Sequence, residues 1–65
     1  MLKMKQIRAD KGISAAKLAR IAEMHPSSIS QIETHRLDPY PAQRTKIAAA
    51  LGWKGDPADL FKEAE

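Results

Sequence analysis

Residues 26–34 carry side chains whose types and spacing suit hydrogen bonding to an extended partner. In a helix, one arc of this segment presents Pro26, Ser27, Ser30, Gln31 and Thr34. The other arc holds Ser28, Ile29, Ile32 and Glu33. A helix that only faces water more usually carries Lys and Glu on its outer side. Short uncharged donors and acceptors instead suit a surface with its own hydrogen-bond pattern, such as base edges in a major groove.

Catalysis needs convergent ionisable groups, and the sequence does not supply them. The chain has only His25 and His35 as histidines, no cysteine, no glycine-rich phosphate loop and no metal-ligand spacing. We therefore expect neither an enzyme nor a metal ion or other cofactor.

Length and composition favour one small domain, residues 1–65, without disulfides. A chain of 65 residues is barely long enough for a single core. Because cysteine is absent, packed helices must supply the stability, which suits a reducing cytoplasm. The longest apolar run, residues 47–51, is far too short to span a membrane. The formal net charge of +3 is compatible with a polyanionic partner.

The polar arc belongs to the second of two short helices joined by a tight turn. Small Ala19 stands where these helices would cross closely, and Ser14 is the expected N-cap of the first one. Free amide groups at that N-terminus form a natural seat for a phosphate. The inward positions of the pair are Leu18, Ala22, Met24, Ile29 and Ile32.

Further helices are expected on both sides of this pair. Residues 1–11 form a helix that ends at Gly12, which can adopt the left-handed backbone conformation. Pro is preorganised for the first helical position, so helices are expected to begin at His25-Pro26, Tyr40-Pro41 and Asp56-Pro57. Arg44 falls on an otherwise apolar arc and is expected to extend outward. Trp53 either covers the core between the last two helices or faces a partner subunit.

In these features the chain resembles the phage repressor and Cro-like helix-turn-helix proteins, also called the xenobiotic-response-element (XRE) family. The resemblance covers about residues 4–61 and is carried by Arg8, Gly12-Ile13-Ser14, Leu18-Ala19, the run 28–33, Arg36, Pro39, Ile47-Ala48 and Leu51-Gly52. It implies an all-α, compact, five-helix, lambda-repressor-like DNA-binding domain. The helix-turn-helix would lie in its second and third helices, about residues 14–34.

The resemblance implies a sequence-specific regulator of transcription that binds double-stranded DNA, here expected to be a repressor at an inverted-repeat operator. Ser14, Thr34 and Arg36 are the candidate phosphate contacts. Pro26, Ser27, Ser30 and Gln31 are the candidate base contacts, with Gln31 suited to adenine and the Pro26 ring to a thymine methyl. Any weak dimer on DNA would form through residues 53–65. We therefore expect a cytoplasmic protein that is prokaryotic or encoded by a phage.

Fold alone does not settle function, so a second hypothesis stays open. A helix-turn-helix scaffold can also act as a protein-interaction module, such as an antitoxin or adaptor. Its sign would be a large exposed apolar surface. RNA binding is less favoured because few aromatic side chains are present for base stacking.

The resemblance also implies a partly buried ion pair between Arg8 and Glu33; the other reading is two unrelated surface charges. Several positions depart from the family pattern, among them Asp38, which puts a negative charge near where cations are common. Ala15 replaces the usual Gln, Glu23 and His35 stand where Gly is favoured, and His25 replaces a Ser or Thr cap. Glu23 is strained if its φ is positive, whereas His tolerates that conformation better. His25 either accepts an amide hydrogen bond, meets a phosphate or faces solvent without a role.

Overall fold

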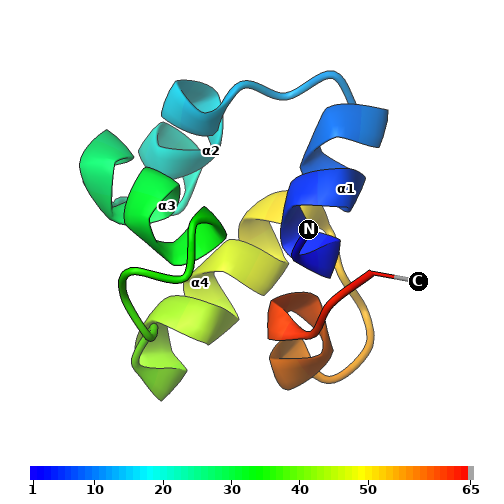
Figure 1. The fold of residues 1–65 in the computed structure, drawn as a ribbon. Helices are drawn as coiled ribbons and strands as arrows, with labels where there is room; N and C mark the ends of the chain where they lie inside the picture. The colour runs from blue at the N-terminus through cyan, green and yellow to red at the C-terminus, as the bar shows by residue number, and fades with distance from the viewer. Residues whose placement is uncertain (65) are drawn as a thin grey trace.

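The computed structural model describes residues 1–64, which form four α-helices and one 3-10 helix. The elements are α1 (Lys3–Asp10), α2 (Ala15–Ile21), α3 (Pro26–Glu33), α4 (Pro41–Leu51) and the 3-10 helix η1 (Pro57–Phe61). In Figure 1, α2 and α3 lie together on one side and α1 and η1 on the other, with α4 running between them. The predicted all-helical fold is confirmed. Glu65, the last residue of the predicted domain and of the predicted dimer segment, lies outside the described residues.

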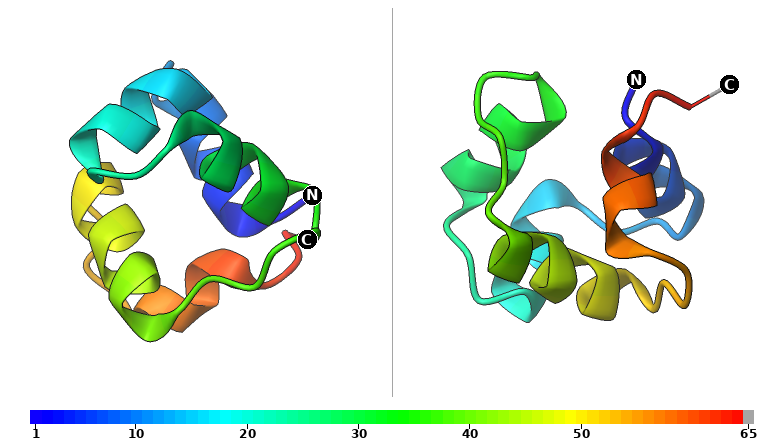
Figure 2. Two further views of the ribbon diagram at one scale, coloured as in Figure 1. Left: turned by 90° about the vertical axis from the view of Figure 1, so that its left-hand side faces the viewer. Right: turned by 90° about the horizontal axis from the view of Figure 1, so that it is seen from below.

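The prediction of five α-helices is not confirmed, because the last helix is only a short 3-10 helix. Its start is as predicted: Asp56 is the N-cap, and its carboxylate accepts a hydrogen bond from the Ala58 N–H at 3.0 Å. After Phe61 the chain becomes extended and pairs with the beginning of the chain. The Lys3 N–H donates to the Lys62 carbonyl at 2.9 Å, and a β-bridge joins Leu2 to Glu63. This pairing takes up the residues that a longer helix would need. It also brings the two ends side by side (Figure 2).

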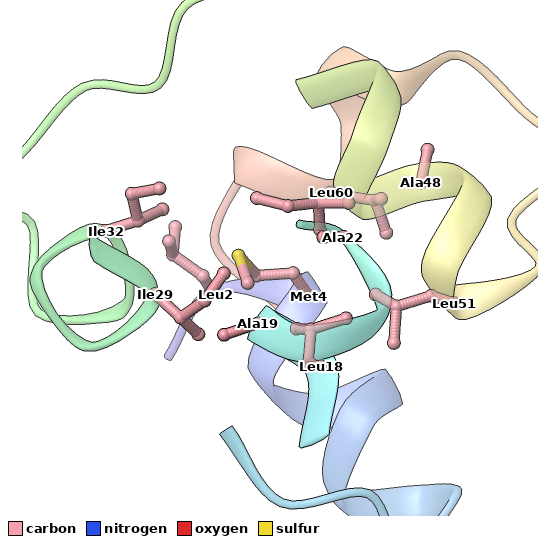
Figure 3. Close-up of a cluster of buried hydrophobic side chains, with 11 residues drawn as sticks. Leu2, Met4, Leu18, Ala19, Ala22, Ile29, Ile32, Ala48, Leu51 and Leu60 are labelled. Atoms are coloured by element: carbon pink, nitrogen blue, oxygen red, sulfur yellow. The ribbon is translucent and has the colours of Figure 1, made fainter. Parts of the chain in front are cut away.

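One hydrophobic core holds the helices together, and every helix contributes to it. Figure 3 shows Met4 and Leu18 at its centre, with Ile29 and Ile32 reaching in from α3. The largest fully buried side chains are Met4, Leu18, Ile29, Ile32, Ile47 and Leu60. Each such residue contributes roughly 1.5–3 kcal/mol by leaving water. The core therefore fixes which side of α3 faces outward.

All four α-helices end in the same backbone motif, in which one residue adopts a left-handed conformation. The residues with positive φ are Gly12 at 68°, Glu23 at 57°, His35 at 62° and Gly52 at 68°. The next N–H then donates back to a carbonyl of the last helical turn, as from Met24 to Ala19 at 2.8 Å. The expectation of left-handed backbone at Gly12 and His35 is confirmed. Glu23 also has the positive φ that makes it strained. The turns before and after α3 therefore both have a left-handed residue that is not glycine.

Trp53 and Arg44 lie where α4 meets η1 and α1. Trp53 is half-buried against the core, its indole N–H donates to the Asp56 carbonyl at 3.0 Å, and the Lys3 Nζ lies 5.1 Å from the ring centroid. The Arg44 guanidinium lies 5.9 Å from the centroid of Phe61. Trp53 thus covers the core between α4 and η1, which was the first of its two predicted places.

Candidate nucleic-acid interface

The predicted polar arc of α3 faces outward. His25 is the N-cap with extended backbone, and Pro26 occupies the first turn, so α3 begins at the predicted residue. Ile29 and Ile32 anchor its other side in the core, with exposed fractions of 0% and 1%. The residues that the structure leaves exposed include Pro26, Ser27, Ser30, Gln31 and Thr34. These are the residues that the sequence placed on the outer arc.

Some side chains on this face already form hydrogen bonds within the protein, whereas others are uncommitted and can bond to a partner. The Thr34 hydroxyl donates back to the Ser30 carbonyl at 2.9 Å, so its proton is already used within the helix. Ser27 Oγ lies 2.7 Å from His25 Nδ1. Within residues 1–64 the side chains of Ser30 and Gln31 have no hydrogen-bond partner. Gln31 is therefore the longest uncommitted donor and acceptor on the face.

The helix that precedes α3 holds it closely. Ala19 of α2 is completely buried, which lets the two helices approach each other. Ser14 caps α2, its Oγ accepting a hydrogen bond from the Lys17 N–H at 3.1 Å. Ser14 itself is exposed on the surface. Figure 2 (left) looks onto the side of the molecule where α2 and α3 lie. The two helices thus form a helix-turn-helix with an exposed second helix.

An ion pair between α1 and α3 fixes the far end of α3. Arg8 Nε donates to Glu33 Oε2 at 2.8 Å, and Arg8 Nη2 donates to Oε1 at 3.1 Å. Glu33 is the one charged residue among those buried in residues 1–64, with 9% exposed. The structure therefore brings together the two residues that the resemblance paired.

Arg36 follows α3 on an exposed turn. Its backbone N–H donates to the Gln31 carbonyl at 2.8 Å, across the left-handed residue His35. This bond ties the position of Arg36 to the last turn of α3. Within residues 1–64 the guanidinium forms no ion pair, and neither do Lys17 and Arg20 on the exposed side of α2. Three positive charges are thus uncompensated around α2 and α3, whereas Asp38 adds one exposed negative charge nearby.

Two features of this region were missed by sequence reasoning. The first is the contact between Ser27 Oγ and His25 Nδ1, although the pattern of a histidine cap with a serine two residues later is visible in the sequence. The second is Tyr40, which was read only as the start of α4 and is 71% exposed. Nothing in the sequence indicates that this aromatic side chain would be exposed at the end of the loop after α3.

Comparison with known proteins gives one match. A family model described as helix-turn-helix, of the XRE and Cro-like type, matches residues 4–54. That segment runs from the second residue of α1 to beyond the end of α4, so it includes α2, α3 and the loop that carries Arg36. No curated protein and no solved structure matches the chain.

Proposed function

Because this chain belongs to the XRE-type, Cro-like helix-turn-helix family, we propose that it is a sequence-specific regulator of transcription that places α3 in the major groove of DNA. The family is a DNA-binding regulatory one and is generally non-enzymatic. The observation that carries the proposal is the outer face of α3. It is exposed, uncharged and rich in hydrogen-bonding groups, and Ser30 and Gln31 on it are uncommitted within residues 1–64. Such a face matches base edges better than it matches water.

We assign the contacts to two classes. Ser14, Thr34 and Arg36 hold phosphates and set the position of the protein on the duplex. Ser27, Ser30 and Gln31 reach base edges, and the Pro26 ring contacts a thymine methyl. Thr34 contributes through its oxygen lone pairs and its methyl group, since its proton is donated within the helix. Arg36 supplies the charge, and the hydrogen bond from its backbone N–H to the Gln31 carbonyl fixes the point on the chain from which its side chain extends.

The finer proposal is repression at an inverted repeat, with two copies bound by a weak dimer contact that forms on DNA. That contact would use residues 53–65, where Trp53 and Phe61 are half-buried rather than fully covered. The proposed function requires no metal ion, cofactor or catalytic group. Within residues 1–64 no group of His, Asp or Glu residues is placed to hold a metal ion. None of the helices described is long and apolar enough to cross a membrane. We propose a cytoplasmic location, where the protein meets DNA.

The alternative, a protein-interaction module, predicts a large continuous apolar surface. The large hydrophobic residues exposed in residues 1–64 are Met1, Ile21 and Tyr40, which belong to three separate segments. A shallow hollow beside Ile21, lined also by Ala49 and Ala50, has a volume of about 240 Å³. That is below the volume of a usual ligand pocket. The polar face of α3 is therefore the better-supported binding surface.

The proposal is tested by selecting bound duplexes from a pool of random sequence. Enrichment of one motif is expected, and two inverted copies of it would support dimeric binding. The matched control is the double variant Ser30→Ala, Gln31→Ala. It changes only exposed side chains, and alanine favours the helical conformation of α3. It should retain weak binding to all duplexes and enrich no motif. A parent protein that binds no duplex at low salt would overturn the proposal.

A further inference from the structure

His25 and Ser27 form a hydrogen-bonded pair at the exposed start of α3. His25 Nδ1 lies 3.2 Å from the backbone nitrogen of Ser27 and 2.7 Å from Ser27 Oγ. Both residues are exposed, and within residues 1–64 the other ring nitrogen of His25, Nε2, has no partner. Ser27 belongs to the outer arc that we assign to the major groove, and within residues 1–64 no other hydrogen bond fixes the protons of the pair.

The two contacts determine where the protons lie. A backbone N–H can only donate, so the Nδ1 atom that caps Ser27 must be the unprotonated nitrogen of a neutral imidazole. The ring proton is then on Nε2, which points away from the Ser27 contacts. Because Nδ1 has no hydrogen, the short contact to Ser27 Oγ requires the serine hydroxyl to be the donor. Ser27 is left with its lone pairs facing outward.

On this basis we infer that His25 is a positioning residue that sets the hydrogen-bond polarity of Ser27 towards a base. The inference rests on the proposed binding of α3 to DNA. With neutral His25, Ser27 is an acceptor only. In the major groove the base donors are the amino groups of adenine and cytosine, whereas guanine and thymine present acceptors at the corresponding carbonyl positions. Ser27 therefore selects an amino base over a keto base at the position it contacts.

Protonation of His25 reverses this polarity. Nδ1 then carries a hydrogen, which it donates to Ser27 Oγ, and the serine hydroxyl proton becomes free to point outward. Ser27 can now donate to a keto oxygen. The charged residues on the segments next to His25 are Glu23 in the same turn and Lys17 and Arg20 on α2, and Lys46 on α4 lines a hollow with Glu23. Within residues 1–64 none of them forms an ion pair with His25. The base preference therefore depends on the protonation state of the imidazole.

The proton positions are tested first on the free protein, by ¹H–¹⁵N spectra of the imidazole nitrogens of the neutral form. We expect Nδ1 to have the shift of an unprotonated acceptor and Nε2 that of a protonated nitrogen. A neutral His25 with its proton on Nδ1 would overturn the inference, whether or not the protein binds DNA.

The base preference is tested with duplexes that carry each of the four bases at every position of the selected motif, at about pH 8 and about pH 5.5. At the position contacted by Ser27, the parent should favour A or C over G or T at the higher pH by about threefold to tenfold, the size of one neutral hydrogen bond. At the lower pH this preference should disappear or reverse. Effects of pH on phosphate contacts, including any from His35, change all four duplexes alike and so cancel in the ratio.

Two variants give the matched controls, and circular dichroism at both pH values confirms that each is folded. His25→Asn keeps a good cap without a titrating group, so its base preference should be the same at both pH values. Ser27→Ala should remove the preference at that position. A preference that depends on Ser27 but is unchanged by pH in the parent, or that still changes with pH in His25→Asn, would overturn the inference and leave DNA binding intact. Absence of any selected motif would instead overturn the proposed function, and the inference with it.

Discussion

Arg8 joins Glu33, at the last turn of α3, to the loop that leads into α2. Its Nε and Nη2 donate to the two carboxylate oxygens of Glu33, and its Nη1 donates to the Ile13 carbonyl at 2.9 Å. The side chains of Arg8 and Glu33 are only 15% and 6% exposed. One guanidinium thus ties α1, the residue before the Ser14 cap, and the end of α3. This contact fixes the direction of α3 relative to α2.

Removing the carboxylate should destabilise the protein strongly, because it leaves a charge without a partner in a largely buried site. We expect Glu33→Ala to lower the free energy of unfolding by about 3 kcal/mol. Urea denaturation measures the loss. The double variant with Arg8→Met should recover part of it, since no unpaired charge remains. Losses that simply add in the double-mutant cycle would contradict an energetic coupling between the two residues.

Strain at Glu23 should make the turn before α3 easy to stabilise. Its φ of 57° is left-handed, and a side chain in that region costs roughly 1–2 kcal/mol relative to glycine. The greater freedom of glycine in the unfolded chain offsets part of this gain. Glu23→Gly should therefore raise the free energy of unfolding by about 1 kcal/mol. The control Glu23→Ala removes the same charge but keeps the strain, so it should show no such gain in urea denaturation.

The parts of this structure that sequence reasoning predicted are those with local causes. The Ser14 cap depends on a residue three positions away, and the left-handed residues Gly12 and His35 depend on the end of their own helix. The division of α3 into a buried and an exposed arc follows from helical periodicity alone. That periodicity also defined the exposed residues of the candidate interface.

The parts that depend on distant segments could not be predicted in this way. The last helix is short because residues 62–64 pair with the start of the chain, which nothing in residues 56–61 indicates. The contact of Arg8 with Glu33 spans 25 positions, and only the family resemblance suggested it. The contact between His25 and Ser27 is local, but it depends on two side-chain rotamers that spacing does not specify.

Arg36 should act on DNA binding through charge rather than through sequence. Each phosphate neutralised by a side chain contributes about −0.9 to the slope of log K against log salt. Arg36→Ala should therefore make that slope shallower by about one unit and weaken binding to all duplexes similarly. Lys5→Ala is the matched control, because it removes one positive charge from α1, a helix that carries no proposed contact with DNA or with a second copy. Equal slopes for the parent and Arg36→Ala would exclude a phosphate contact at Arg36.

Glu63 should stabilise the pairing of the two chain ends only above acidic pH. Its carboxylate accepts a hydrogen bond from the Met1 amino group at 2.7 Å and contacts His35 Nε2 at 2.9 Å. The hydrogen bond from the amino group, helped by the charges of that group and of His35, holds the pKa of Glu63 below its ordinary value of 4.5. A lowered pKa in the folded state means that the stabilisation is full above 4.5 and is lost as the pH falls through the lowered value.

Thermal unfolding of Glu63→Gln tests this dependence. At neutral pH the variant should have a slightly lower Tm than the parent, since exposed ion pairs contribute little. The difference in Tm should shrink as both proteins are acidified below the ordinary pKa of a glutamate. A difference that stays constant across that range would mean that the charge of Glu63 makes no contribution.

Gln31 should carry more sequence discrimination than any other single residue. It is exposed on the outer arc of α3, its amide is uncommitted within residues 1–64, and its side chain is longer than those of the serines on the same arc. A glutamine amide can donate to N7 of adenine and at the same time accept from the N6 amino group of that base. Gln31→Ala should therefore cost about 1–3 kcal/mol on the selected motif and almost nothing on a scrambled duplex. The matched control is Gln6→Ala, which changes an exposed glutamine on α1 and should alter neither affinity.

Measuring both duplexes at one salt concentration separates the possible roles of Gln31. Equal losses on the two duplexes would move Gln31 to the phosphate contacts, and no loss on either would remove it from the interface.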